Sequence, residues 1–492
     1  MNPYLIKAAA VAAKKKRDHH DDVLEKLEKS PGVVAQHSMG SGKTLLSLKA
    51  AARAQQEHKG KIVVISAPAS VVKQFPDEAK KFNIDLDEKR LKLLSHEEFV
   101  NRAKDLANEK ISLLVVDEGH RLRNPETSKN KAHSLVRQSA DKALVMSGTA
   151  MYNKPHDLAA LVNLAAGHKA LPEKEMDFAS EFIGVEKVKP GVVKRMFGAT
   201  DGERTYLKNK GKLGKVLKEY VHNYDAKENI PEEFAKTTER IHKVEMSPQQ
   251  YRYYRFAENE LPWPIRVKIR AGLPLSKKES QSLNTFSSAV RQVSNSYASF
   301  TLDPEKVESS PKFNEMLGHQ KELRKQLKDK YRGVVYSNYL GSGLSHYSKL
   351  LEKEGVPHGV YTGELTKTEK KRMVDDFNEG KFDTLLLSSS GSEGLNLKGV
   401  RHVQIMEPHF NKSKIMQVAA RAVRRGSHAH LPENERHVQI DHYHSELPKG
   451  LFGKPKGEGI DEYLHNLSEE KEIIKTDINK VIDAEDKKKP RK

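Results

Sequence analysis

The sequence predicts an α/β protein of two lobes, each built on a parallel sheet flanked by helices. Short runs of apolar residues occur in two separate sets, and the runs are continuous rather than alternating. A continuous apolar run is typical of a strand covered on both faces. Stretches of helical composition separate the runs within each set. Because two sets of runs occur in a chain of 492 residues, we expect two such lobes.

The first set predicts strands at 32–35, 62–65, 113–116 and 143–146, and the second at 333–336, 384–387 and 402–405. The stretch from about 155 to 310 is rich in Lys and Glu and predicts helices. An amphipathic helix is predicted at 460–482. We therefore divide the chain into an N-terminal helical segment, a first lobe with a helical insert after about 155, a helical linker region, a second lobe, and a C-terminal helix with a basic tail. Their ranges are 1–30, 31–240, 241–310, 311–447 and 448–492.

Charge and cysteine content restrict the partners and the compartment. Lys and Arg number 86 against 67 Asp and Glu, a net charge of +19, which favours nucleic acid or a membrane surface as the partner. No apolar run approaches the ~18 residues of a transmembrane helix, and the N-terminus is not a secretory signal. The chain has no Cys, which excludes disulfides and suits a reducing compartment. We expect a cytoplasmic protein that binds nucleic acid and no membrane.

Two groups of histidines are candidate metal ligands. His19 and His20 precede two aspartates, but neighbouring residues on a helix point in different directions, so a solvated helix face is the preferred interpretation. The second group lacks helical His-x-x-x-His spacing and any Cys, so no zinc site is predicted there. Its members are His428, His430, His437, His442 and His444.

The strongest local motif, MGSGKT at 39–44, follows the first strand and opens a helical stretch. Glycines let backbone N–H groups approach phosphates, Lys meets the β- and γ-phosphates, and a Thr hydroxyl can hold Mg²⁺. The alternative is a glycine-rich turn that binds nothing, and position 37 is His where the full pattern has Gly. The predicted ATP-binding residues here are Gly40, Ser41, Gly42, Lys43 and Thr44.

Two adjacent carboxylates, Asp117 and Glu118, end the third strand. Ligands bind at the carboxyl edge of an open parallel sheet, so this pair is expected beside the phosphate loop. Asp117 would bind Mg²⁺, and Glu118 would orient and deprotonate the attacking water. An acidic strand end is otherwise a common solvated feature.

A third group lies near the end of the second lobe, in QVAARAVRRG at 417–426. Gln417, Arg421 and Arg424 fall at i, i+4 and i+7, which predicts one helix face. Guanidinium groups can stabilise charge on a transferring phosphate, although a basic solvated face is the competing interpretation.

In chain order these motifs resemble a superfamily-two helicase-like ATPase of the SWI/SNF-type branch, over about 31–475. The segments that carry the resemblance are MGSGKT, SAPASVVKQF, DEGHRLRN, MSGTAMYN, VVYSNYL, SSSGSEGLNL and QVAARAVRRG. HSMGSGKT and RRGSHAHLPENERHVQIDHYHS look most like viral members. The resemblance implies two tandem RecA-like lobes and the cofactors ATP and Mg²⁺.

The resemblance also implies roles for individual residues. Lys43 and Thr44 match the phosphate and Mg²⁺ positions, and Asp117 and Glu118 match the metal-binding and water-activating pair. The remaining matches are Ser147 and Thr149 in the interlobe coupling motif, Gly394 and Asn396 in a motif that contacts nucleic acid and nucleotide, and Arg421 and Arg424 as arginine fingers beside Gln417.

The chain departs from the family pattern at three places. Position 119 is Gly where the family usually has Ala, and His37 and Ser38 stand where many cellular members have Asp-Glu. The glutamine-containing adenine-recognition motif is not recognisable before Gly32, which leaves the base specificity open.

The function expected from these motifs is ATP-driven translocation along double-stranded DNA. The alternative is a strand-separating DNA or RNA helicase in viral transcription or replication, because the motor residues would be the same. A third alternative, a scaffold without catalysis, is disfavoured because Lys43, Glu118 and Arg421 are all present.

Overall fold

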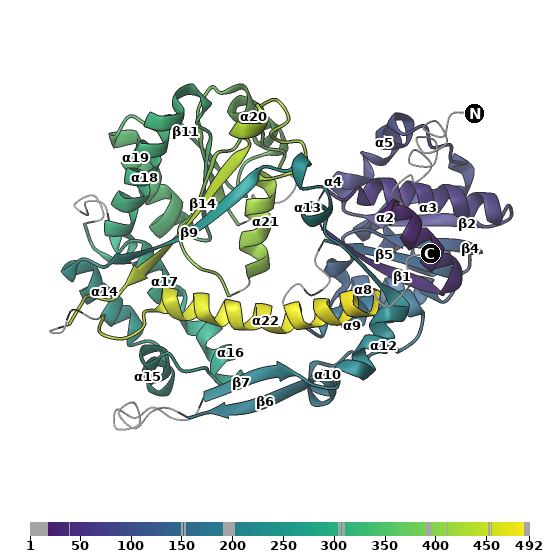
Figure 1. Ribbon diagram of the computed structural model, residues 1–492, viewed down its shortest axis with the longest axis horizontal. Helices are drawn as coiled ribbons and strands as arrows, with labels where there is room; N and C mark the ends of the chain where they lie inside the picture. The colour runs from purple at the N-terminus through teal and green to yellow at the C-terminus, as the bar shows by residue number, and fades with distance from the viewer. Residues whose placement is uncertain are drawn as a thin grey trace, which may run out of the picture. The chain divides into compact units, whose positions relative to one another are not determined.

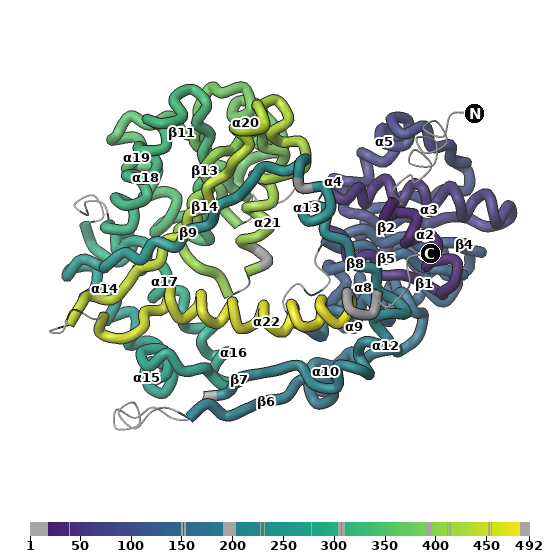
Figure 2. Tube along the Cα trace, in the orientation of Figure 1, coloured from purple at the N-terminus to yellow at the C-terminus, as the bar shows by residue number. Residues whose placement is uncertain are grey.

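The computed structural model describes residues 18–38, 40–148, 151, 154–189, 202–303, 307, 310–389, 395–410, 412–450, 453 and 455–486. The chain forms two compact units, coloured by residue number in Figures 1 and 2. The first unit comprises Met1–Ile183, Leu207–Asn229 and Lys475–Lys492. The second comprises Gly184–Tyr206 and Ile230–Ile474.

The first unit is built on a six-stranded parallel sheet, in the order β3-β2-β4-β5-β1-β8. Its central strands are buried on both faces because successive apolar side chains point to opposite sides. Val33 and Ala35 of β1 join the core with α2, α3 and α5 on one face. The strands are β1 (Gly32–His37), β2 (Ile62–Ala67), β3 (Leu91–Ser95), β4 (Ile111–Val116), β5 (Ala140–Ser147) and β8 (Val221–Tyr224).

Helices surround this sheet, and α9 contacts β1 and β5. The helices are α2 (His19–Lys29), α3 (Lys43–Glu57), α4 (Ala69–Val72), α5 (Phe75–Lys81), α6 (His96–Asn101), α7 (Ala103–Leu106), α8 (Ser128–Arg137), α9 (Asp157–Ala166), α10 (Glu175–Phe182), α12 (Lys210–Tyr220) and α13 (Ala226–Asn229), with short turns η1 (Glu88–Arg90) and η2 (Gly119–Leu122).

The second unit is built on another six-stranded parallel sheet, in the order β11-β12-β10-β13-β14-β9. Alternate residues of its strands face two separate cores, one formed with α20 and α21 and the other with α18 and α19. The strands are β9 (Lys236–Glu245), β10 (Gly333–Ser337), β11 (His358–Tyr361), β12 (Thr384–Ser388), β13 (His402–Ile405) and β14 (His437–Glu446).

A third core joins the helices α14 to α17 to the start of α22. The helices of the second unit are α14 (Pro248–Glu258), α15 (Trp263–Ala271), α16 (Lys277–Phe286), α17 (Ser288–Asn295), α18 (Pro311–Leu327), α19 (His346–Lys353), α20 (Lys367–Glu379) and α21 (Lys412–Ala422), with short turns η3 (Pro231–Glu233), η4 (Ala298–Phe300), η6 (Lys328–Lys330), η7 (Leu340–Ser345) and η8 (Glu433–Glu435). α22 (Ile460–Asp486) contributes to both units, and β6 (Ile183–Val188) and β7 (Gly202–Leu207) form a separate two-stranded sheet.

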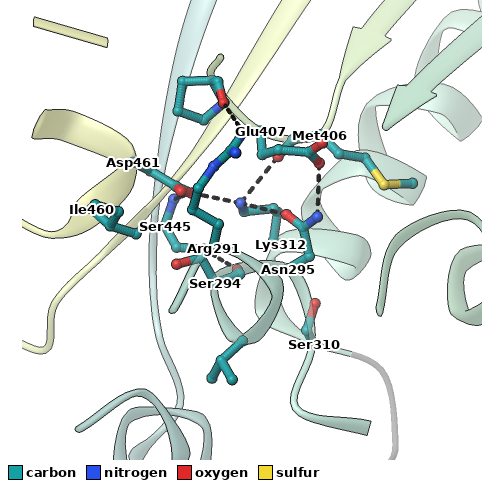
Figure 3. Close-up of polar contacts among 12 residues, drawn as sticks. Arg291, Ser294, Asn295, Ser310, Lys312, Met406, Glu407, Ser445, Ile460 and Asp461 are labelled. Carbon is teal, nitrogen blue, oxygen red and sulfur yellow. Dashed lines mark hydrogen bonds and ion pairs between the residues drawn. The ribbon is translucent and has the colours of Figure 1, made fainter. Parts of the chain in front are cut away.

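A buried polar network ties the second unit together around Lys312 of α18 (Figure 3). The Lys312 ammonium donates to Oδ1 of Asn295 at 3.0 Å, to the carbonyl oxygen of Met406 at 3.0 Å and to Oδ2 of Asp461 at 2.8 Å. All three of its N–H bonds therefore have an acceptor. Asn295 in turn donates to Glu407 at 2.7 Å. The network connects α17, α18, the end of β13 and the first turn of α22.

All seven predicted strands and the C-terminal helix are present, so the predicted α/β architecture of two parallel sheets is confirmed. Five further sheet strands, β3, β8, β9, β11 and β14, were not predicted. The stretch expected to be a helical insert also contains β6 and β7. The boundary expected at residue 240 falls inside β9, and all ten residues of β9 pair with β14 in the second sheet.

Candidate nucleotide site

The phosphate loop connects β1 to α3 at the carboxyl edge of the first sheet. Gly40 and Gly42 have φ of 83° and 80°, a left-handed conformation that glycine adopts without steric cost. Lys43, the first residue of α3, turns its ammonium back to the loop and donates to the carbonyl oxygens of His37 at 3.1 Å and Ser38 at 3.3 Å. Thr44 follows in the first helical turn, and Met39 lies outside the described residues.

The two residues that stand in place of the family's Asp-Glu anchor the loop to the edge strand β8 and to the start of α13. His37 is fully buried, and its Nε2 lies 2.9 Å from Nδ1 of His222. Burial holds the pKa of His37 far below its usual range, so the ring is neutral. The hydroxyl of Ser38 accepts the backbone N–H of Ala226 at 2.8 Å. These contacts fix the position at which the loop leaves β1.

The N-terminus of α2 packs against the loop, so the interpretation of His19 and His20 as a solvated face is wrong. Nε2 of His19 and Nε2 of His20 lie 2.8 and 2.9 Å from the carbonyl oxygen of Ser41. The ring of His19 stacks on Tyr224 of β8, with ring centroids 3.6 Å apart. Burial lowers the pKa of His20 to about 4. These contacts could not be predicted from the sequence because they depend on where α2 packs.

The carboxylate pair follows β4, as expected for a sheet-edge site. Asp117 is buried, and its Oδ1 accepts the backbone N–H of Glu118 at 2.9 Å. Glu118 has φ of 50°, a left-handed conformation that is uncommon for residues other than glycine and clusters at functional sites. Burial and the neighbouring Glu118 raise the pKa of Asp117 to about 6, while the Lys43 ammonium opposes this shift.

Three strand ends meet at this edge of the first sheet. A Cβ atom at Gly148, which follows β5, would lie 3.8 Å from Nζ of Lys43 and 3.8 Å from the carbonyl oxygen of His37. The charge of Lys43 also acts on Asp117. The structure thus brings the phosphate loop, the carboxylate pair and the end of β5 together.

His120 joins the carboxylate pair to Ser147, a connection that the sequence did not reveal. Nδ1 of His120 lies 3.2 Å from Oε2 of Glu118 and 3.5 Å from the hydroxyl of Ser147, which is fully buried. Thr149 lies outside the described residues.

The glycine at position 119 has a steric reason. A Cβ atom there would lie 2.6 Å from Cγ1 of Val145 on the neighbouring strand β5, closer than two carbon atoms can approach. Alanine, the usual residue of the family, would therefore require Val145 to move.

The arginine motif lies in the second unit, and the expected single helix face is only partly correct. Gln417 and Arg421 lie one turn apart on α21. The helix ends at Ala422, so Arg424 lies in the turn that follows and is exposed. Arg425 forms a two-pronged ion pair with Glu233, in which Nη2 lies 2.9 Å from Oε1.

The remaining predicted site residue in the second unit is Asn396. Its side chain is exposed, and its carbonyl oxygen accepts Nδ2 of Asn378 at 3.0 Å. Gly394 lies outside the described residues.

Family models match most of the chain. An SNF2-related domain matches residues 87–329, a helicase conserved C-terminal domain matches 318–426, and a type III restriction enzyme res subunit matches 7–153. Within the described residues, no helix is both long and apolar enough to cross a membrane.

The similar proteins include several from large viruses. A protein of Acanthamoeba polyphaga mimivirus, named as an ATP-dependent RNA helicase, is 29% identical over 95% of this chain and 96% of its own. A termination factor NPH-I homolog of African swine fever virus is 26% identical over 90% of this chain and 74% of its own. The crystal structure of the Pyrococcus furiosus Hef helicase domain has the same fold, with a TM-score of 0.50 and 14% identity over 88% of this chain and 96% of that one. The chain belongs to the SNF2-related branch of the superfamily-two helicase-like ATPases, which use ATP and act on nucleic acid.

Proposed function

We propose that this ATPase moves along double-stranded DNA by hydrolysing ATP. The observation that carries the proposal is the convergence of Lys43, Asp117 and Gly148 at one sheet edge, in a chain that matches the SNF2-related and helicase C-terminal models.

Hydrolysis is assigned to the first unit. Lys43 binds the β- and γ-phosphates, and its two bonds to loop carbonyls show that its ammonium already points into the loop. Thr44 and Asp117 supply hard oxygen ligands of the type that Mg²⁺ prefers, and bound Mg²⁺ offsets the phosphate charge. Burial and the charge of Glu118 raise the pKa of the Asp117 carboxyl, and the Lys43 ammonium offsets this only in part. A bound cation would supply the remaining counter-charge, so Asp117 fits the role of a metal ligand. Glu118 accepts the proton of the attacking water.

The second unit is assigned the positive charges that stabilise the transition state of ATP hydrolysis. Arg421 and Arg424 stabilise the transferring phosphate as arginine fingers, and Gln417 lies beside them. Ser147 and Thr149 are assigned the coupling of the two units. Ser147 contacts His120, which in turn contacts Glu118, and this chain of contacts offers a physical route for the coupling. Gly394 and Asn396 are assigned a contact with nucleic acid.

Duplex DNA is the proposed track because the chain has SNF2-related matches and a net charge of +19. Contacts to the phosphate backbone position a protein without reading bases, so binding should show no sequence preference. Each phosphate neutralised adds about 0.9 to the slope of log affinity against log salt concentration on duplex DNA.

The second candidate function is strand separation on RNA or DNA. It is supported by the names of viral relatives, which include ATP-dependent RNA helicases and a termination factor homolog. The two functions share the ATP site and differ in the track and in the fate of the strands.

The deciding experiment measures ATP turnover separately with duplex DNA, single-stranded DNA and RNA, at low and moderate salt. Duplex DNA should stimulate most, and a third strand should be displaced from a triplex while an ordinary partial duplex stays paired. Unwinding of the partial duplex, with stimulation mainly by single strands or RNA, would replace the translocase by the second candidate.

The control is Glu118→Gln, whose amide cannot accept the proton of water. This variant should bind ATP and nucleic acid but lose about 10²–10⁴-fold in turnover. Turnover at the parent rate would show that Glu118 is not the base, whichever track is correct.

A further inference from the structure

We propose that the second unit holds a divalent transition-metal ion, with zinc the best match, between His242 of the edge strand β9 and Glu315 and His319 of α18. Neither histidine belongs to the groups that the sequence singled out. The three residues belong to the second unit, whereas the phosphate loop and the carboxylate pair belong to the first, and the proposal does not depend on the proposed track.

One ligand atom from each of these three residues lies within 4.8 Å of the other two. Nε2 of His319 is 3.7 Å from Oε1 of Glu315, and the rings of His242 and His319 have centroids 4.2 Å apart. Glu315 and His319 share a helix face because they are four residues apart. Ligand atoms around a tetrahedral zinc with bonds of about 2.0–2.1 Å lie about 3.3 Å apart, so an ion would have to draw these atoms together by at most about 1.5 Å.

Asp441 fixes the proton of His242 so that a ligand atom is available. Nε2 of His242 lies 2.9 Å from Oδ1 of Asp441, and Nε2 of His402 lies 2.8 Å from Oδ2. Nε2 of Gln439 also donates to Oδ2 of Asp441, at 2.7 Å, so three side chains surround this carboxylate. A carboxylate oxygen that accepts the Nε2–H of His242 leaves the lone pair on Nδ1 for a metal.

Tyr443 holds the second imidazole in place. Its phenol oxygen lies 3.0 Å from Nδ1 of His319 and accepts Nε2 of Gln404 at 2.9 Å. The contact leaves Nε2 of His319 on the side of Glu315. With a metal on Nε2, the ring proton resides on Nδ1 and is donated to the phenol oxygen. Histidine ligands in metal sites usually make such a second hydrogen bond, which sets the orientation of the ring.

The chemistry of the ligands selects the metal. Two imidazoles and one carboxylate match zinc, whereas Mg²⁺ and Ca²⁺ prefer oxygen ligands alone. The side chains of His242, His319 and Glu315 are 18%, 25% and 47% exposed, so an ion can enter from solvent. Three protein ligands leave a fourth position for water.

Metal binding would attach β9, the edge strand of the second sheet, to the helix α18. β9 is the last strand in the order of the second sheet and pairs with β14, and seven of its ten side chains are exposed. A metal shared with α18 would add a second, side-chain connection between this strand and the rest of the unit.

The test titrates the full chain, first stripped with EDTA, with Co²⁺ and follows the visible absorption bands of the bound ion. We expect one equivalent of Co²⁺ that Zn²⁺ displaces, and loss of the bands in His242→Ala and His319→Ala. Tyr443→Phe keeps the ring but loses the hydrogen bond, so it should fold normally by circular dichroism and weaken binding by about 10–100-fold.

The matched control is His19→Ala, because Asp18, His19 and His20 form another group whose ligand atoms lie within 4.8 Å of one another. This variant should bind Co²⁺ as the parent does. Absence of bound Co²⁺ in the parent, unchanged binding in His319→Ala, or loss of binding only in His19→Ala would each overturn the proposal.

Discussion

At the scale of single residues, the nucleotide site contains a group that weakens the folded protein in the absence of ligand. Asp117 is buried beside Glu118, and its pKa is raised to about 6, whereas an unfolded Asp titrates near 3.9. Between these two values the folded chain binds more protons than the unfolded chain. The free energy of unfolding therefore falls as the pH rises from about 4 to about 6, and the cost remains in full at higher pH.

Replacing Asp117 by Asn should stabilise the nucleotide-free protein at pH 8. The amide still accepts the N–H of Glu118 but carries no charge, so the gain is on the order of 2 kcal/mol for the first unit. At pH 5 the gain should be about half as large, because this pH lies near the middle of the interval between the folded and unfolded pKa values of Asp117. Thermal unfolding of parent and variant at the two pH values measures the difference.

Asp141→Asn is the control, since Asp141 lies at the start of β5 in an exposed ion pair with Lys61. It should change the midpoint little at either pH. An equal gain from Asp117→Asn at pH 5 and pH 8 would show that the ionised carboxylate is not the cause.

Residue roles differ in how far the sequence can predict them. Lys43 and Asp117 follow buried strands in a fixed order, so their meeting at one edge of the sheet was predictable. The roles of His120 and His19 and the need for glycine at 119 could not be predicted, because each depends on a contact with a part of the chain distant in sequence. His120 contacts β5, His19 contacts the phosphate loop, and Gly119 lies against Val145.

At the scale of elements, α21 separates the two arginines that the spacing placed on one face. Arg421 lies on the helix, one turn from Gln417, while Arg424 lies beyond its end at Ala422. The i, i+7 pattern predicts a shared face only while the helix continues. Where the turn begins depends on local bonds such as that from the backbone N–H of Ser427 to the carbonyl oxygen of Arg424 at 2.9 Å.

Arg421→Ala should leave ATP affinity nearly unchanged and lower nucleic-acid-stimulated turnover by up to ~10³-fold, as expected for the loss of an arginine finger. Arg421→Lys should not restore turnover, because an ammonium lacks the planar fork of donors. Steady-state turnover, together with the binding of a fluorescent ATP analogue, separates the two effects.

Arg425→Ala provides the comparison within the same motif. Arg425 is held by Glu233, which suits a structural role, and its loss should leave stimulated turnover close to the parent value. The opposite ranking of the two variants would move the finger to Arg425.

At the scale of the whole molecule, the interior strands of both sheets apart from β14 were predictable, and the four edge strands, β3, β8, β9 and β11, were not. Strands such as β4 and β10 are buried on both faces and are therefore continuously apolar. β9, with the sequence KTTERIHKVE, is an exposed edge strand rich in charged residues. It therefore lacks the continuous apolar run by which strands were predicted. Its place beside β14 follows from tertiary packing, which also moves the boundary between the sheets from residue 240 to before Lys236.

The network around Lys312 should determine the stability of the second unit. Lys312 and Asp461 are almost fully buried, so removing one charge leaves the other uncompensated. Asp461→Asn should lower the free energy of unfolding by about 3–5 kcal/mol. The double variant Lys312→Gln/Asp461→Asn should lose less than the sum of the two single variants, as measured by urea unfolding.

Lys321 and Glu354 form an ion pair in the same unit but at its surface. Glu354→Gln should leave the unfolding midpoint nearly unchanged, since exposed pairs contribute little. Strict additivity of the Lys312 and Asp461 variants would show that the two side chains do not act as a pair.

The same pair imposes an order on biosynthesis. Asp461 follows Lys312 by 149 residues, and translation proceeds at about 5–20 residues per second, so Lys312 leaves the ribosome roughly 7–30 s before its counter-charge. During this interval an ammonium destined for the interior remains in water, and the second sheet cannot close around it. The nascent second unit must therefore wait as an incomplete intermediate, whose uncovered apolar strands are natural clients for chaperones. A ribosome that stalls before the codon for Asp461 would release a chain with the whole sheet but without the charge that completes it.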